Sequence, residues 1–188
     1  MLTASGPPAT RRTREFAALA AGLSVAVAAL TLALTRAERP LEAAVLVALG
    51  CVIGWIVAVD IQSLRAPNRI VYASVVAGLA ASALLGREAL LDALSGGMLA
   101  FLLLLVVALL GRGAMGYGDV KAGALCGITT GIAGAMTMLV VAFVAGGFFA
   151  AVLLLARVRG RRDVVAFTPF LALGVLAALA TTPGYLVA

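Results

Sequence analysis

The chain of 188 residues is 64% hydrophobic and 12% charged, with a mean hydropathy of +1.17. Soluble domains carry about a quarter of their residues as charge, so this composition excludes an ordinary water-soluble domain and favours an integral membrane protein. The chain contains no His, which excludes imidazole as a general base or metal ligand. Cys51 and Cys126 are lone thiols in apolar runs, so we expect small buried hydrophobes and predict no disulfide framework, metal site or cofactor.

The net charge of +6 and the pI near 10.4 raise the question of a nucleic-acid partner. In a membrane protein, however, Arg and Lys usually record which loops stay in the cytoplasm. We therefore predict the lipid bilayer, and no nucleic acid, as the surroundings of this chain.

Uncharged apolar stretches follow one another along the chain at 16–35, 43–59, 70–85, 93–110, 122–156 and 164–188. A membrane helix needs about 17–25 residues, so the first four stretches each suit one span, the third being slightly short. Residues 1–15 are predicted to be a disordered cytoplasmic N-terminus, and 16–188 a single transmembrane domain. The first stretch is too long for a usual signal peptide and lacks a good cleavage site, so we expect a retained span.

The stretch 122–156 is too long for one span, because its helix would measure about 52 Å against an apolar layer of about 30 Å. We predict that it folds back near 129–134, where two Thr and two Gly weaken a helix. The expected fold is an all-α polytopic membrane protein with about seven transmembrane helices, or six if 122–156 is one span.

The basic residues agree with the fold-back. With seven spans and a cytoplasmic N-terminus, 11 of the 14 Lys and Arg lie inside and only Arg36, Arg39 and Arg87 lie outside. A single span at 122–156 would export the four Arg of 157–162 and leave 7 on each side. We therefore place the N-terminus in the cytoplasm and the C-terminus outside.

Two of the eight acidic residues stand apart from the rest. Six lie in charged connections, where loop or helix-end roles explain them: Glu15, Glu38, Glu42, Glu88, Asp92 and Asp163. Asp60 and Asp119 lie instead at the cytoplasmic margins of predicted spans, where an ionisable group is a functional candidate because burying it costs a few kcal/mol.

Two neighbouring carboxyl groups offer a hydrolytic mechanism that needs no His, Cys or metal. One activates a water as a base while the other, protonated, donates to the substrate carbonyl oxygen. The structural alternative stays open: each Asp caps a helix or pairs with a basic residue.

Glycines surround the second candidate. Gly111, Gly113, Gly116 and Gly118 precede Asp119. Gly123, Gly127 and Gly131 then recur every four residues, a spacing that lets membrane helices pack closely. We expect this face to pack against the second or third span and so to bring Asp119 to Asp60.

Three motifs carry a resemblance to a family. Gly116-Tyr117-Gly118-Asp119-Val120-Lys121 resembles the GxGD motif of membrane-embedded aspartic proteases, and its GxGDxK form is similar to prepilin peptidases (type IV leader peptidases). Asp60 followed by Arg65-Ala66-Pro67-Asn68, and Ala166-Phe167-Thr168-Pro169-Phe170-Leu171-Ala172-Leu173-Gly174, resemble further elements of that family, in its order. The chain departs from the pattern at Ala66, where Ile is usual, and at Thr168, where Gly is common.

The resemblance implies a GxGD aspartic protease fold with Asp60 and Asp119 as the catalytic pair. The implied reaction removes the basic leader from type IV prepilin, Flp-type pilin or pseudopilin precursors at the cytoplasmic face of the cell membrane. Supporting roles fall to Gly116, Gly118, Lys121, Pro67, Asn68 and Pro169. Pro67 and Asn68 are expected to set the turn that aims Asp60, and Lys121 to extend toward lipid headgroups rather than to act on Asp119.

The chain has no paired cysteines of the kind found in the long members of this family. It therefore resembles a short, peptidase-only form, and no methyltransferase activity is predicted. Two other functions stay open: a small transporter or channel whose two Asp bind a cation or relay protons, and a non-catalytic partner in pilus assembly.

Overall fold

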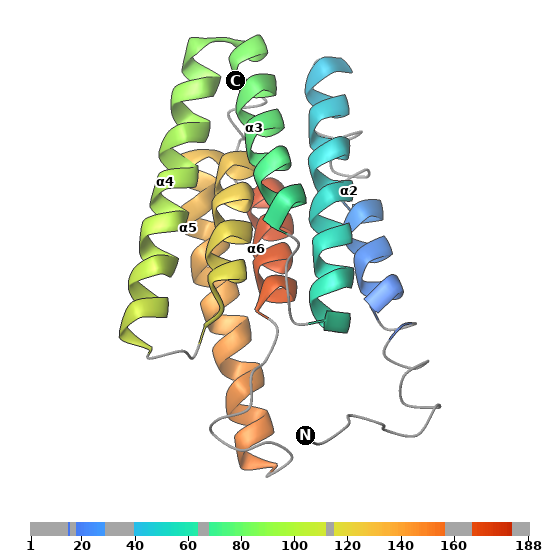
Figure 1. Ribbon diagram of the computed structural model, residues 1–188, viewed down its shortest axis with the longest axis vertical. Coiled ribbons are helices and arrows are strands. Elements are labelled where there is room, and N and C mark those ends of the chain that lie inside the picture. The colour runs from blue at the N-terminus through green and yellow to red at the C-terminus, as the bar shows by residue number, and fades with distance from the viewer. Residues whose placement is uncertain are drawn as a thin grey trace.

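The computed structural model describes residues 15, 18–28, 40–63, 68–111, 115–156 and 167–181 (Figure 1). These form a short helix Ala18–Ala28 and the helices α2 (Pro40–Ser63), α3 (Asn68–Leu85), α4 (Arg87–Leu110), α5 (Tyr117–Leu155) and α6 (Thr168–Thr181). The described residues contain no strand, so the all-α prediction is confirmed.

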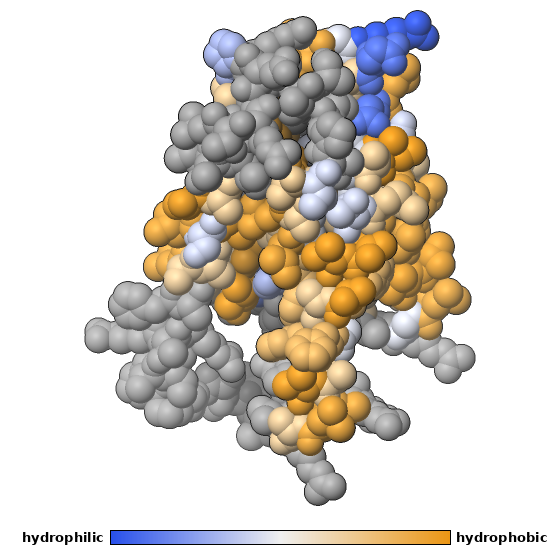
Figure 2. Space-filling view, turned by 180° about the vertical axis from the view of Figure 1, so that it is seen from behind, coloured by the Kyte–Doolittle hydropathy of each residue, from blue (hydrophilic) through white to orange (hydrophobic). Residues whose placement is uncertain are grey.

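Three helical segments are long and apolar enough to cross a membrane: Ala43–Ile61, Arg87–Leu110 and Tyr117–Val152. Shorter apolar helices lie at Ala18–Ala28, Arg69–Leu85 and Thr168–Thr181. Large hydrophobic side chains cover much of the outside, and the face in Figure 2 is mostly hydrophobic along the helices. Such a surface suits lipid rather than water. The chain therefore has the architecture of a polytopic membrane protein, and the number of seven spans stays a prediction.

The predicted fold-back lies inside α5. Gly131 has φ 66° and ψ −177°, a left-handed conformation that Gly adopts without strain, and it separates two helical halves, 117–130 and 132–155. Thr168 bonds to Asp119 in the first half, whereas its neighbour Phe167 packs against Phe143 in the second half, with ring centroids 5.6 Å apart. A straight helix would separate positions 119 and 143 by about 36 Å. The halves therefore run antiparallel, as Figure 1 shows.

The glycine face of α5 has a different partner from the one expected. A Cβ at Gly127 would meet the carbonyl carbon of Gly96 at 2.8 Å, and one at Gly96 would meet the backbone of Gly131 at 2.5 Å. Gly123 packs against Leu104, also of α4. The expectation that this face meets the second or third span was wrong. Small residues of α4, Gly96 and Ala100, lie opposite the glycines of α5 and let the two backbones approach closely.

Four of the six acids for which loop or helix-end roles were predicted lie among the residues that the structure describes. Glu15, Glu42, Glu88 and Asp92 all lie in helical segments, and Glu42 and Glu88 lie within the first three residues of α2 and α4, which fits the predicted helix-end role. Asp92 of α4 accepts a hydrogen bond from the backbone N–H of Ile132 at 3.1 Å. The break at Gly131 leaves N–H groups of the second half of α5 without helical partners, so the Asp92 carboxylate caps a helix end.

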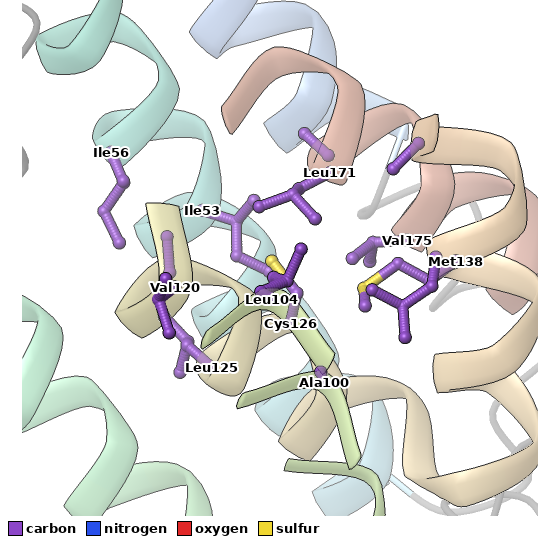
Figure 3. Packing of buried hydrophobic residues seen from close by; sticks show 14 of the residues in the cluster. Ile53, Ile56, Ala100, Leu104, Val120, Leu125, Cys126, Met138, Leu171 and Val175 are labelled. Atoms are coloured by element: carbon purple, nitrogen blue, oxygen red, sulfur yellow. The ribbon is translucent and has the colours of Figure 1, made fainter. Parts of the chain in front are cut away.

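The core lies between α2, α4, α6 and both halves of α5 (Figure 3). Ile53 and Ile56 reach it from α2, Leu104 from α4, and Leu171 from α6. Cys126 is buried there as expected, whereas Cys51 is exposed on α2, so the expectation of a second buried thiol was wrong. Hydropathy alone cannot distinguish a core-facing thiol from a lipid-facing one.

Candidate active site

Three helix ends meet at one end of the bundle. The C-terminal end of α2, the N-terminus of α5 and the N-terminus of α6 all lie toward the lower end in Figure 1. They carry Asp60, Asp119 and Thr168 respectively. The sequence prediction that Asp60 and Asp119 share one face of the bundle therefore agrees with the structure.

Asp60 belongs to the buried face of α2. Ile53, Ile56 and Val57 precede it at seven, four and three positions, a spacing that places all four side chains on one side of a helix. Asp60 is only 5% exposed, and its Oδ2 has no hydrogen-bond partner. A carboxyl oxygen buried without a partner lowers stability. An apolar side chain would therefore suit a purely structural role at this position better than Asp60 does.

Asp119 is held by the first turn of α5. The N–H of Asp119 donates to the Gly116 carbonyl oxygen at 3.0 Å, and the N–H of Gly116 lies within bonding reach of the Asp119 carboxylate. This reciprocal arrangement is half of a capping box, with Gly116 as the N-cap residue and Gly118 within the first turn. Asp119 is partly exposed, unlike Asp60. The first of the two supporting glycines therefore contributes its backbone to orienting the carboxylate.

Thr168 connects the two carboxyl groups. Its Oγ1 donates to Oδ1 of Asp119 at 3.0 Å. Both its hydroxyl and its backbone N–H lie within bonding reach of Asp60 as well as Asp119. That N–H belongs to the first turn of α6, where helical N–H groups lack partners and the helix dipole favours negative charge.

The carboxyl groups of Asp60 and Asp119 are close enough to act on each other electrostatically. Two acids that are 59 positions apart in sequence thus face one another from α2 and α5, with a hydroxyl and a helix N-terminus between them. Such a pair can share a proton, with one member serving as base and the other as acid.

Sequence reasoning did not assign Thr168 a role, and noted it only as a departure from a family pattern. A Thr just before Pro169 indicates the start of a helix, because both residue types favour the first turn. Pro169 indeed lies in the first turn of α6, which begins at Thr168. Nothing in that local signal reveals that the hydroxyl reaches two acids on other helices.

Lys121, two residues after Asp119, contacts an aromatic ring of α3. Its Nζ lies 5.0 Å from the ring centroid of Tyr72 on α3. A cation over an aromatic face is attracted by the ring's quadrupole. Lys121 thus contacts α3. Its extension toward lipid headgroups stays a prediction.

Two of the predicted supporting residues cannot be placed fully. Pro67 lies outside the described residues, and Asn68 begins α3, although its side chain lies outside them. The predicted turn that would aim Asp60 is therefore still a prediction. Within the described part of the chain, no three His, Cys, Asp or Glu side chains form a cluster suited to a metal ion.

The fold and this site define a helical membrane-type protein with two facing carboxyl groups at one end. Comparison with protein families adds the name of the class: the type IV leader peptidase family matches residues 46–151. The match contains Asp60 and Asp119 and ends before α6. No curated protein and no solved structure matches the chain. The chain belongs to the type IV leader peptidase family.

Proposed function

We propose that this protein is a membrane-embedded aspartic endopeptidase. It removes the basic leader of type IV prepilin, Flp-type pilin or pseudopilin precursors at the cytoplasmic face of the cell membrane. Membership of the type IV leader peptidase family supports a peptidase of this general kind. The aspartic mechanism, the substrate and the membrane face are our proposal.

The observation that carries the proposal is the meeting of Asp60, Asp119 and Thr168 at one end of an apolar bundle. In the proposed reaction, the ionised member of the acid pair takes a proton from a water as that water attacks the scissile carbonyl carbon. The protonated member donates its proton to the carbonyl oxygen, giving a neutral tetrahedral diol. Collapse of the diol returns a proton to the leaving amine and breaks the C–N bond.

The location of the acids suits the proposed substrate. A precursor of this class has a basic leader followed by a hydrophobic helix, so its cleavage point lies where the membrane meets the cytoplasm. Asp60 lies near the C-terminal end of α2 and Asp119 near the N-terminal end of α5, so neither acid lies halfway along its helix. Coupling ions of transporters are bound nearer the membrane midplane, so the position favours the peptidase over a transporter.

The test uses the full chain in liposomes with a candidate precursor, and mass spectrometry to detect the released leader. We expect Asp60→Asn and Asp119→Asn each to lower the rate of cleavage by at least about 1,000-fold, because an amide can neither donate as an acid nor accept as a base. Asp92→Asn is the matched control. Asn caps a helix about as well as Asp, so this variant should cleave at the wild-type rate.

Other outcomes separate the competing functions. Full-rate cleavage by both single variants would overturn the aspartic mechanism. Asp-dependent ion or proton flux without cleavage would identify a transporter. Precursor binding without cleavage, unchanged in both variants, would identify an assembly partner.

A further inference from the structure

We propose that Thr168 is a positioning residue that orders the carboxyl pair: its hydroxyl donates to Asp119 and thereby assigns the proton of the pair to Asp60. The inference rests on the proposed aspartic peptidase and deepens it. It names which acid activates the water, Asp119, and which one protonates the substrate carbonyl, Asp60.

The first step is the hydrogen-bond capacity of a hydroxyl. Thr168 has one O–H hydrogen, and that hydrogen is committed to Oδ1 of Asp119 at 3.0 Å. The same hydroxyl lies within bonding reach of Asp60. Toward Asp60 the hydroxyl oxygen can only accept, and an ionised carboxylate has nothing to donate. While that hydrogen is bonded to Asp119, the hydroxyl can bond Asp60 only by accepting from it, which requires a protonated Asp60; the backbone N–H of Thr168 is then the Thr168 donor left for Asp60.

Burial leads to the same assignment. Asp60 is 5% exposed with Oδ2 lacking any partner, whereas Asp119 is partly exposed and is also approached by the Gly116 N–H. Burying an unpartnered charge costs more than burying a neutral carboxyl group. The ionised member is thus the one with more hydrogen-bond donors and with access for water.

The fold fixes the direction of the hydroxyl. Thr168 is 1% exposed and has a β-branched side chain, which restricts rotation about χ1. Gly174 packs α6 against the backbone at Met138, and the Phe167 ring packs against that of Phe143, so the start of α6 is held against the second half of α5. The hydroxyl is therefore oriented by packed helices rather than by a loop.

The chemistry of the reaction agrees with this division. A carboxylate that accepts from a hydroxyl and a backbone N–H retains lone pairs for a water, so Asp119 can still accept the water's proton. Asp60 in turn gives its proton to the carbonyl oxygen, and the Thr168 hydroxyl then donates to whichever carboxylate is newly charged. No cofactor enters either step.

The experiment compares Thr168→Val with Thr168→Ser in the liposome cleavage assay. Val matches the shape of Thr without the hydroxyl, whereas Ser keeps the hydroxyl. We expect Thr168→Val to lower kcat about 10- to 100-fold with KM within about 2-fold of wild type, because a hydrogen bond to a charged group is lost at the reacting acids. Thr168→Ser should stay within about 5-fold of wild type.

Infrared difference spectra of the same proteins test the proton directly at neutral pH. Wild type minus Asp60→Asn should show the C=O stretch of a protonated carboxyl group, and wild type minus Asp119→Asn the bands of an ionised carboxylate. Thr168→Val should shift the protonated band. The reverse assignment of bands, or a Thr168→Val variant with wild-type kcat, would overturn the inference.

The two levels of the proposal fail separately. If the Asp→Asn variants cleave at full rate, the proposed function fails whatever Thr168 does. If they are inactive while Thr168→Val cleaves as wild type, the function stands and only the role of Thr168 is lost. Folding is checked by the unfolding temperature of Thr168→Val in detergent. If Thr168→Val does not fold, Thr168→Ser decides the outcome: a Thr168→Ser protein whose kcat falls well below that of wild type refutes the positioning role.

Discussion

Asp60 and Asp119 have different surroundings, although the sequence places both at the margins of predicted spans and predicts one catalytic pair. Asp60 lies among the apolar side chains of α2 with one oxygen unpartnered, whereas Asp119 begins a helix and receives a backbone N–H. Identical side chains thereby acquire different chemistry from position alone. The sequence predicted that both acids matter, since both lie at the margins of predicted spans. It could not predict their difference, which depends on how α6 packs against α5.

The contact between Lys121 and Tyr72 is testable at the level of single side chains. Tyr72→Leu removes the ring beneath the ammonium group, whereas Tyr72→Phe keeps it. We expect Tyr72→Leu to lower the free energy of unfolding by about 0.5–2 kcal/mol and Tyr72→Phe to change it by less than about 0.5 kcal/mol.

Denaturation of the detergent-solubilised protein, followed by circular dichroism, measures both values. Equal losses in the two variants would show that the tyrosine hydroxyl, and not the aromatic face, holds α3 to the start of α5.

Among the helices, α5 shows what a sequence pattern can and cannot establish. The length of the apolar stretch 122–156 required a fold-back, and the turn falls at Gly131, inside the predicted interval. The partner of the glycine face was predicted wrongly, because spacing identifies a close-packing face but not the helix opposite it. Asp92 completes the hairpin: in an apolar layer the freed N–H of Ile132 needs an acceptor, and α4 provides one.

Close packing of α4 and α5 predicts different outcomes for two glycines of the same helix. A Cβ at Gly127 would meet the Gly96 carbonyl carbon at 2.8 Å and the Ala100 Cβ at 2.9 Å, whereas a Cβ at Gly147 would meet nothing within 4 Å. We expect Gly127→Ala to cost about 1–3 kcal/mol of stability and to slow cleavage, since α5 carries Asp119. Gly147→Ala should be neutral or slightly stabilising.

Thermal unfolding in detergent and the cleavage assay check this pair of variants together. A Gly127→Ala protein as stable as Gly147→Ala would contradict the backbone contact between α4 and α5.

For the whole molecule, composition and the arrangement of charge established the class before any contact was known. The all-α membrane architecture is confirmed. Orientation in the membrane is a further expectation, since the positive-inside argument puts the acid pair on the cytoplasmic side. The start of α4 and its end at Gly111 lie at opposite ends of the bundle (Figure 1), and the end at Gly111 is the end with the acids.

Labelling of single cysteines with a membrane-impermeant maleimide tests this orientation. In a Cys51→Ala background, with buried Cys126 retained, Glu88→Cys should react in intact cells and Gly111→Cys only after permeabilisation. Both Glu88 and Gly111 are exposed, so access to the reagent decides the result. The opposite pattern would place the acid pair outside the cell and exclude a substrate whose leader stays in the cytoplasm.

The central claim is that the two carboxyl groups act as one unit. The most direct measurement compares single-turnover cleavage rates of wild type, Asp60→Asn, Asp119→Asn and the double variant in liposomes with one precursor. Residues that act together are strongly non-additive, so each single variant should be as slow as the double variant, within about 3-fold. Independent losses that multiply in the double variant, or a single variant that retains the wild-type rate, would contradict the account.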